Sequence, residues 1–267
     1  MNTFWRPRLP DGQRRRGRFA TVVPAALLLL LVFGVWQLYV SVKHVNEVIL
    51  PSPWEVLHTL ATSKQLLATN LVVTGEEIVL GFILGAVAGI LLGIFITYST
   101  ILERALLPLV IASQVIPIFA IAPLLIIWFG FGITPKVLIA ALIVFFPICV
   151  NQVEGLRSAD EGAVDLIRSY GASEIKVFWM VRMPASVPFV LAGMQIGVTF
   201  SVIGAVIAEW VGAQKGLGAL MLSAASLSNT TVVFAAIVTV AVVGVVLFAL
   251  VRIVGDLLFP WQAKPKA

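Results

Sequence analysis

The feature that most constrains this chain is a series of six long apolar segments separated by polar ones. The first, residues 19–40, contains no charged side chain, and the others are expected at 71–98, 106–129, 136–153, 189–210 and 232–258. About 20 apolar residues let a helix cross the hydrocarbon core of a bilayer. Hydrophobic residues make up 60% of the chain, charged residues 12%, and the mean hydropathy is +1.05. The sequence therefore predicts an all-α polytopic membrane protein with six transmembrane helices.

The distribution of Lys and Arg predicts the topology. Residues 1–18 carry six arginines and are expected to form a basic tail before a membrane domain of residues 19–267. With the N-terminus inside, 14 of the 18 Lys and Arg fall in inner segments. The four in outer segments are Lys43, Lys64, Lys136 and Lys215. This bias predicts that both termini lie in the cytoplasm. A cleaved or twin-arginine signal is the alternative for the first apolar segment, but no small-residue cleavage site follows it.

Residues 41–70 and the single cysteine each allow a further prediction. Pro51, Pro53 and Trp54 open a stretch within 41–70 that repeats apolar residues at helical spacing, which predicts a short interfacial helix with Trp54 as its anchor. The single cysteine, Cys149, excludes a disulfide within one chain and is expected to be a small buried apolar residue.

The second apolar segment contains a ridge of small residues. Glycine recurs there at every fourth position: Gly81, Gly85, Gly89 and Gly93. This spacing places all four on one helix face and favours close approach of a neighbouring helix. Glu76 and Glu77 precede the ridge and are expected to reach the headgroups, with one of them facing a pore as the alternative.

The third apolar segment is unusually rich in proline. It contains Pro108, Pro117 and Pro123, with Ser113 and Gln114 between the first two. Proline frees backbone carbonyl groups, which membrane helices tolerate where they line protein or water. Broken helices of this kind are typical of transport pathways.

A polar loop at 154–188 separates the fourth and fifth apolar segments. Its pattern predicts two short amphipathic helices, the first ended by Gly171 and the second capped by Ser173. Pro184 and Pro188 are expected to end the second helix before the next span. Such a loop is typical of a docking surface for a soluble partner, with an ordinary solvated loop as the alternative.

At this loop the chain resembles the EAA loop of bacterial ATP-binding-cassette (ABC) importer permeases. That loop reads Glu-Ala-Ala, three residues, Gly, nine residues, then aliphatic-any-Leu-Pro. The corresponding positions here are Asp165, Leu166, Ile167, Gly171, Val181, Met183 and Pro184. Gly171 and Pro184 agree with the pattern, whereas Asp165 replaces Glu, Leu166 and Ile167 replace both alanines, and Met183 replaces Leu. The resemblance covers roughly residues 45–260 and implies a type I importer (MetI-like) permease fold with cytoplasmic coupling helices.

In this family the loop fits a groove on the ATPase subunit. The resemblance implies this coupling role for Asp165, Leu166, Ile167, Arg168, Tyr170, Gly171, Ala172, Glu174, Met183 and Pro184. It also implies a second permease copy, two ATPase subunits that bind ATP and Mg, and an extracellular or periplasmic substrate-binding protein. No cofactor is expected in this chain, membrane lipid surrounds it, and no nucleic acid is expected.

Four stretches outside the loop, 50–60, 112–137, 145–158 and 201–221, resemble the branch that imports nitrate, sulfonates, taurine, the thiamin pyrimidine precursor and riboflavin. The resemblance is greatest to permeases for the last two. The residues expected along a substrate path are Gln114, Pro117, Trp128, Phe129, Glu209 and Trp210. Gln114 and Glu209 would hydrogen-bond a neutral heterocycle and the aromatic rings would stack on it. The alternative for Trp128 and Trp210 is membership of the aromatic belts at the membrane interfaces.

The sequence offers no chemistry of its own. It contains no G-x-x-x-x-G-K-[ST] phosphate-binding loop, and its two histidines, His44 and His58, do not form a metal or catalytic motif. The chain is therefore predicted to be a transporter subunit rather than an enzyme, with ATP hydrolysed on another polypeptide. The alternatives are a sulfonate, taurine or nitrate importer, an ATP-independent channel or secondary carrier, and a membrane scaffold.

Overall fold

The computed structural model describes residues 11–259, the side chains of 11–22 and 25 excepted. The basic residues before 19 and those after 259 therefore lie outside the described side chains. Every secondary-structure element within the described residues is a helix. The helices are α1 (Asp11–Lys43), α2 (Pro53–Thr62), α3 (Lys64–Thr97), α4 (Thr100–Ser113), α5 (Ile118–Phe129), α6 (Ile133–Arg157), α7 (Glu161–Ser169), α8 (Glu174–Val177), α9 (Met183–Gly212), α10 (Leu217–Ser226) and α11 (Thr230–Leu258).

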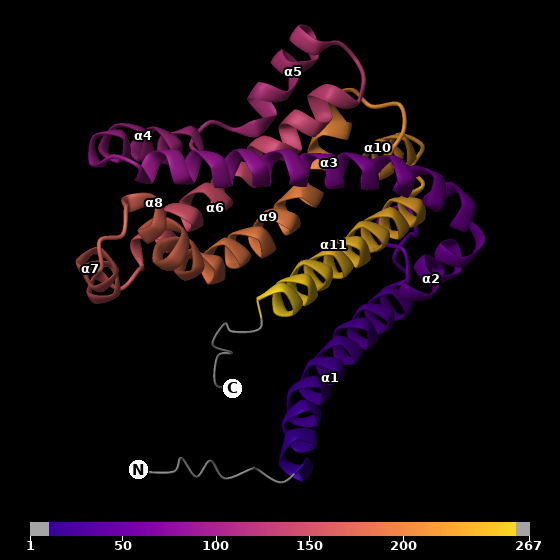
Figure 1. The fold of residues 1–267 in the computed structure, drawn as a ribbon. Helices are drawn as coiled ribbons and strands as arrows, with labels where there is room; N and C mark the ends of the chain where they lie inside the picture. The colour runs from indigo at the N-terminus through magenta and orange to yellow at the C-terminus, as the bar shows by residue number, and fades with distance from the viewer. Residues whose placement is uncertain (1–10, 260–267) are drawn as a thin grey trace.

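The membrane character predicted from hydropathy is confirmed. Within the described residues, five helical stretches are long and apolar enough to cross a membrane: α1, α3, α6, α9 together with α8, and α11. A sixth is obtained if α4 and α5 count as one broken span. Figure 1 shows α7 and α8 at one end of the molecule, here called the loop end, and α10 at the opposite end, here called the far end.

The third expected span is not a single helix. Residues 106–129 fall in α4 and α5, which meet at 94°. At the break, the N–H groups of Gln114, Val115 and Ile116 bind carbonyls three residues back, at 3.1 to 3.3 Å. Pro117 follows and has no N–H to donate, so the α-helical ladder cannot continue through it. The prediction of a proline-broken third span is correct, and the break lies at Pro117.

The fifth span begins earlier than expected. Pro184 and Pro188 do not end the preceding helix: Pro184 lies in the first turn of α9 and Pro188 inside it. Just before Pro184, the N–H of Met183 donates to the Phe178 carbonyl five residues back, which is a π-helical bond. A π-helical turn, Phe178–Arg182, joins α8 to α9, so the helical path is unbroken from Glu174 to Gly212.

The core is a layer of three helices, with α6 between α3 and α9. On the α3 side, the glycine ridge lies against α6, and a Cβ atom at Gly89 would be 2.7 Å from the carbonyl oxygen of Phe145. On the α9 side, Gly204 approaches α6 equally closely, since its Cβ would be 2.9 Å from Ala140 Cα. Both contacts bring backbone against backbone, which substitutes for the hydrophobic driving force that lipid does not supply.

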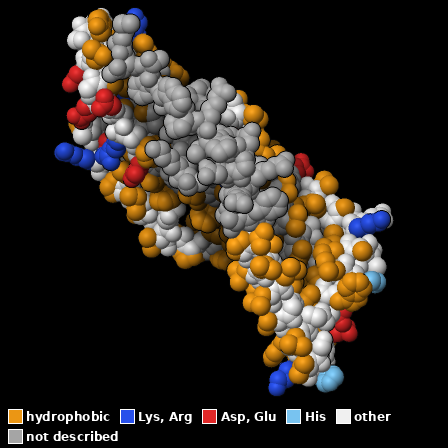
Figure 2. All heavy atoms as spheres, turned by 90° about the horizontal axis from the view of Figure 1, so that it is seen from below, with side chains coloured by type: hydrophobic (Ala, Val, Ile, Leu, Met, Phe, Trp, Pro, Cys, Tyr) orange, Lys and Arg blue, Asp and Glu red, His pale blue; other side chains and the backbone are white. Residues whose placement is uncertain are grey.

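The N-terminal helix stands apart from this core (Figure 1). In its membrane-length window, Ala26–Lys43, Val40 is buried and the other residues are exposed or partly exposed. Its contact with the bundle includes Trp36, whose ring lies 5.6 Å from that of Phe234 on α11. The short helix expected within 41–70 is α2. Ser52 and Glu55 cap it reciprocally, and Trp54 is exposed. Among the described residues, Figure 2 shows hydrophobic side chains over much of the visible face and most of the charged side chains toward its two ends.

Candidate functional site

The α7–α8 loop is a built structure, with its helix ends satisfied by local hydrogen bonds. Asp160 caps α7 by accepting from the N–H of Ala163 at 3.0 Å. Gly171 follows the other end at φ +78°. Its N–H donates to the Arg168 carbonyl at 2.8 Å, and the N–H of Ala172 donates to Ile167 at 3.3 Å. This pair of bonds is the Schellman motif, which requires a left-handed residue where Gly171 stands.

An ion pair joins the two short helices of the loop. The Arg168 guanidinium donates to both carboxylate oxygens of Glu174, at 2.8 and 3.0 Å, and lies 3.7 Å from Asp165. The Glu174 carboxylate, and to a lesser extent Asp165, raises the pKa of Arg168. The pair is exposed and contributes little stability by itself. Its two-point geometry nevertheless defines the angle between α7 and α8.

The loop exposes large apolar side chains to the outside. The exposed set, here called the loop surface, is Leu166, Tyr170, Ile175, Trp179 and Met180. Tyr170 is 81% exposed and Trp179 62% exposed. Underneath, Val164 and Val177 are buried and hold the loop on the bundle. An apolar surface carried on a charged loop marks an interaction site.

The predicted coupling residues lie in this region but on different sides of it. Asp165, Leu166, Arg168, Tyr170, Gly171, Glu174 and Pro184 are exposed, whereas Ile167, Ala172 and Met183 are partly buried. Sequence reasoning missed Ile175, Trp179 and Met180, because the motif passes over them. The available signal was three large apolar residues at helical spacing inside a polar loop.

The loop is also tied to the α3–α4 turn. Arg157, at the end of α6, forms an ion pair with Glu103 in the first turn of α4. Beside this pair lies a polar hollow of about 920 Å³, lined by Tyr98, Glu103, Arg157 and Arg182 among others. A displacement of the loop therefore acts on α4 and α6 as well as on α9.

The residues predicted for a substrate path do not converge on one place. Gln114 and Pro117 are exposed at the break between α4 and α5, and Trp128 and Phe129 are exposed at the end of α5. Trp210 stacks on Phe119, with ring centroids 6.5 Å apart. The six positions thus lie on several elements and at different levels of burial.

Both buried acids have partners within the chain, although Oε2 of Glu77 has no hydrogen-bond partner among the described residues. Glu209 is 1% exposed, and its carboxylate accepts hydrogen bonds from Thr74 and from the backbone N–H of Gly218. Glu77, expected at the headgroups, is also 1% exposed, and its carboxylate binds the ammonium of Lys136 at 2.7 Å. Its neighbour Glu76 is exposed, so the headgroup expectation is wrong for Glu77 alone.

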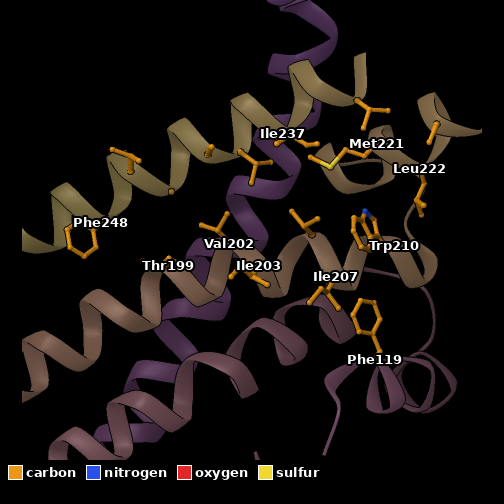
Figure 3. Close-up of a pocket in the computed structure, with 17 residues that line it drawn as sticks. Phe119, Thr199, Val202, Ile203, Ile207, Trp210, Met221, Leu222, Ile237 and Phe248 are labelled. Carbon is orange, nitrogen blue, oxygen red and sulfur yellow. The ribbon is translucent and has the colours of Figure 1, made fainter. Parts of the chain in front are cut away.

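A large apolar cavity lies between α9, α10 and α11. Its volume is about 940 Å³, and Figure 3 shows Phe119, Ile207 and Trp210 at one end and Phe248 toward the other. Of the six predicted path residues, Trp210 lines it. Thr199 contributes a hydroxyl, which already donates to the Gln195 carbonyl at 3.1 Å. The cavity suits apolar atoms and offers few hydrogen-bonding groups.

The described residues contain no group of three or more His, Cys, Asp or Glu able to hold a metal ion. Cys149 is fully buried between α3, α4 and α6.

Comparison with known proteins agrees with this geometry. Residues 81–259 match the family of binding-protein-dependent transport system inner membrane components. The chain is 35% identical to the formylaminopyrimidine transport permease ThiX of Halalkalibacterium halodurans, over 89% of this chain and 95% of that one. It is 36% identical to the riboflavin transport system permease RibX of Chloroflexus aurantiacus, over 91% and 90%.

A sulfonate relative and a solved structure complete the comparison. The taurine transport system permease TauC of Escherichia coli is 30% identical, over 88% of each chain. Among solved structures, an inward-facing form of the MetNI methionine ABC transporter matches with a TM-score of 0.63 and 20% identity, covering 76% of this chain and 98% of that one. This likeness confirms the predicted MetI-like fold. The chain therefore belongs to the binding-protein-dependent transport system inner membrane components, and it is the permease subunit of an ABC importer, a transporter chain whose ATPase is a separate polypeptide.

Proposed function

We propose that this permease moves a small heterocyclic vitamin or vitamin precursor into the cell, riboflavin or the thiamin pyrimidine, and that an ATPase docked on the loop surface drives it. The observation that carries the coupling proposal is the continuity of α8, the π-helical turn and α9. A force on the loop surface acts directly on a helix that crosses the whole molecule.

The proposed assembly contains two copies of this chain, two ATPase subunits with ATP and Mg, and an extracellular or periplasmic binding protein. One chain offers one loop surface, so a pair of ATPases calls for a pair of permeases. With both termini in the cytoplasm, the loop end faces the compartment that holds ATP, in agreement with the Lys and Arg bias.

The coupling residues act in two ways in this proposal. Tyr170, Trp179 and Leu166 supply apolar contact area to the ATPase. Gly171 and the Arg168–Glu174 pair keep α7 and α8 in the orientation that the partner recognises. The ATPase shifts the permease between two states only to the extent that it contacts the loop differently in each.

The choice of a neutral heterocycle rests on two observations. The vitamin-type relatives match this chain at 35 and 36% identity, somewhat above the taurine relative at 30%. In addition, Lys136, the basic residue at the start of α6, is neutralised by Glu77 and is not free to bind an anion. A sulfonate, taurine or nitrate substrate is the second candidate, supported by the taurine relative.

A carrier that works without ATP would need buried ionisable groups free to change partners. Glu209 is buried, but Thr74 and backbone N–H groups already bind its carboxylate. Glu77 is buried too, and Lys136 binds one of its two carboxylate oxygens. The structure thus favours a structural use of Glu209.

The test is uptake into proteoliposomes that contain this chain with its cognate ATPase and binding protein. Riboflavin, the formylaminopyrimidine, taurine and nitrate are compared with and without ATP. We expect ATP-dependent uptake of one heterocycle. Uptake of taurine or nitrate would refute the substrate class and keep the importer, and equal flux without ATP would refute coupling.

Gly171→Pro and Asp165→Lys test the loop itself. Both variants are expected to insert into the membrane normally and to lose ATP-driven uptake. Unchanged uptake by either one would reject the coupling role of that residue.

A further inference from the structure

At the far end of the bundle, side chains of other helices bind the first four backbone N–H groups of α10. The bonds run from Gly216 to Asn70 (2.9 Å), from Leu217 to Thr74 (2.8 Å), and from Gly218 and Ala219 to Glu209 (2.5 and 3.4 Å). The first turn of a helix leaves four such donors without an internal partner. Here two residues of α3 and one of α9 satisfy all of them.

Glu209 is the centre of this arrangement, here called the α10 clamp. Thr74 donates its hydroxyl to Glu209 Oε1 at 2.7 Å while it accepts from α10, and both side chains are buried. A carboxylate at a helix N-terminus is stabilised by the helix dipole, and burial strengthens the attraction. At Gly218 a Cβ atom would lie 2.8 Å from Glu209 Oε2, so glycine lets the carboxylate reach the backbone.

The clamp stands at the opposite end of α9 from the loop surface. The helical path from Glu174 to Gly212 contains 39 residues. At 1.5 Å per residue it extends for about 58 Å. Because no break interrupts this path, α9 is expected to move as a rigid rod that connects the loop surface with Glu209.

Beyond the clamp, α10 borders the apolar cavity. Met221 and Leu222 of α10 line it opposite α9 (Figure 3). Leu217 is fully buried, and Leu217 and Met221 pack in one cluster with Leu67 of α3 and Ala235 of α11. The position of α10 therefore decides how open the far end of this cavity is.

We propose that Glu209, with Thr74 and Asn70, is a positioning group that makes α10 move with α3 and α9, so that a displacement at the loop surface changes the opening of the cavity at the far end. This inference rests on the proposed function, because the loop must be driven for the clamp to transmit anything. A cap that only stabilised the start of α10 would need partners on one neighbouring helix. The α10 clamp instead joins α3, α9 and α10, and its Thr74–Glu209 hydrogen bond links residues 135 positions apart in the sequence.

The first test measures solute uptake and ATP hydrolysis by the whole complex in proteoliposomes. Glu209→Gln removes the charge and turns one acceptor into an N–H₂ group that faces backbone donors. We expect hydrolysis to continue and uptake per ATP to fall about tenfold, the effect of losing one charge-assisted hydrogen bond. The matched control is Glu76→Gln, the same change at an exposed acid of α3, with unchanged coupling.

A reversible link separates positioning from a general loss of structure. Leu67→Cys and Met221→Cys, in a Cys149→Ala background, place a cysteine on each side of the α3–α10 contact. In the Glu209→Gln variant, oxidation of this pair should restore uptake per ATP, and reduction should remove it again. A deficit that oxidation leaves unchanged would overturn the inference.

Three other outcomes are equally decisive. Uptake per ATP in Glu209→Gln equal to that of Glu76→Gln would overturn the clamp while leaving the proposed function intact. If Glu209→Gln does not assemble, Asn70→Ala and Thr74→Val make the same comparison, and full coupling in both would overturn it. Uptake that needs no ATP in the unmodified complex would reject the proposed function and this inference with it.

Discussion

The contact between α3 and α6 can be tested at one glycine against another on the same helix. Gly89 faces α6, and a Cβ atom there would lie 2.7 Å from the carbonyl oxygen of Phe145 and 3.1 Å from the amide nitrogen of Cys149. The first distance is roughly 0.7 Å shorter than ordinary van der Waals contact. Gly75 is also inside α3, but a Cβ there meets no atom within 4 Å. Alanine is therefore expected to be tolerated in place of Gly75 and to be crowded in place of Gly89.

The size of the effect follows from two opposing terms. Replacing glycine by alanine inside a helix stabilises it by about 0.5–1 kcal/mol, and this gain is common to both positions. Adding a methyl group to a packed interface costs about 1–3 kcal/mol, because backbone atoms must move apart. The neighbours of Gly89 are backbone atoms, which cannot rotate out of the way as a flexible side chain does. We therefore expect Gly89→Ala to be less stable than Gly75→Ala by about 1–3 kcal/mol.

Both variants are purified in the same detergent and unfolded with increasing sodium dodecyl sulfate, and the free energy of unfolding is taken from each transition. Gly75→Ala should match or slightly exceed the unmodified chain, and Gly89→Ala should fall below it. Equal stability of the two variants would show that α3 and α6 do not pack as closely as described, and the account of the glycine ridge would fail.

Three further outcomes are expected. Gly171→Ala, strained by about 1 kcal/mol at positive φ, should reduce ATP-driven uptake, whereas Gly162→Ala on α7 should not; equal uptake would contradict this. Trp179→Ser should weaken ATPase binding in a pull-down titration, unlike Trp54→Ser at the other end of the molecule. The backbone N–H of Ser52, which precedes α2, donates a hydrogen bond to the Glu55 carboxylate and lowers the pKa of that group. This hydrogen bond is therefore present above the ordinary pKa of Glu and is lost as the pH falls through the lowered value. Hydrogen exchange of the Ser52 amide, measured as a function of pH, should show this loss of protection. Glu55→Gln should abolish the pH dependence of the protection.

Much of the architecture follows from local sequence. An apolar run of about 20 residues has few alternatives to a membrane helix, because every backbone group must be paired inside the hydrocarbon. A glycine at every fourth position marks one face of a helix without reference to anything else in the chain. The two helices of the polar loop and the cap at Gly171 are also local, since their hydrogen bonds span three to six residues.

Other features depended on contacts between distant residues. Pro184 and Pro188 are helix breakers by local rules, yet α9 contains both, with Pro184 directly after the π-helical turn and Pro188 inside the helix. The spacing of Ile175, Trp179 and Met180 indicated an apolar helix face, but that this face is exposed was decided by the packing of Val164 and Val177 against the bundle. The 94° bend between α4 and α5 likewise has a local cause in Pro117 but an angle that packing determines.

Glu209 shows the difference most clearly. From the sequence it is an acid near the end of an apolar span, equally suited to a headgroup, a solute or a pore. In the structure its partners are Thr74, 135 residues away, and the backbone of a short helix that hydropathy did not predict. Sequence periodicity tells which face of a helix is apolar, because that depends on 3.6 residues per turn alone. Which donor binds a given buried acid depends on how helices from distant parts of the chain pack. The local spacing of residues does not contain that information.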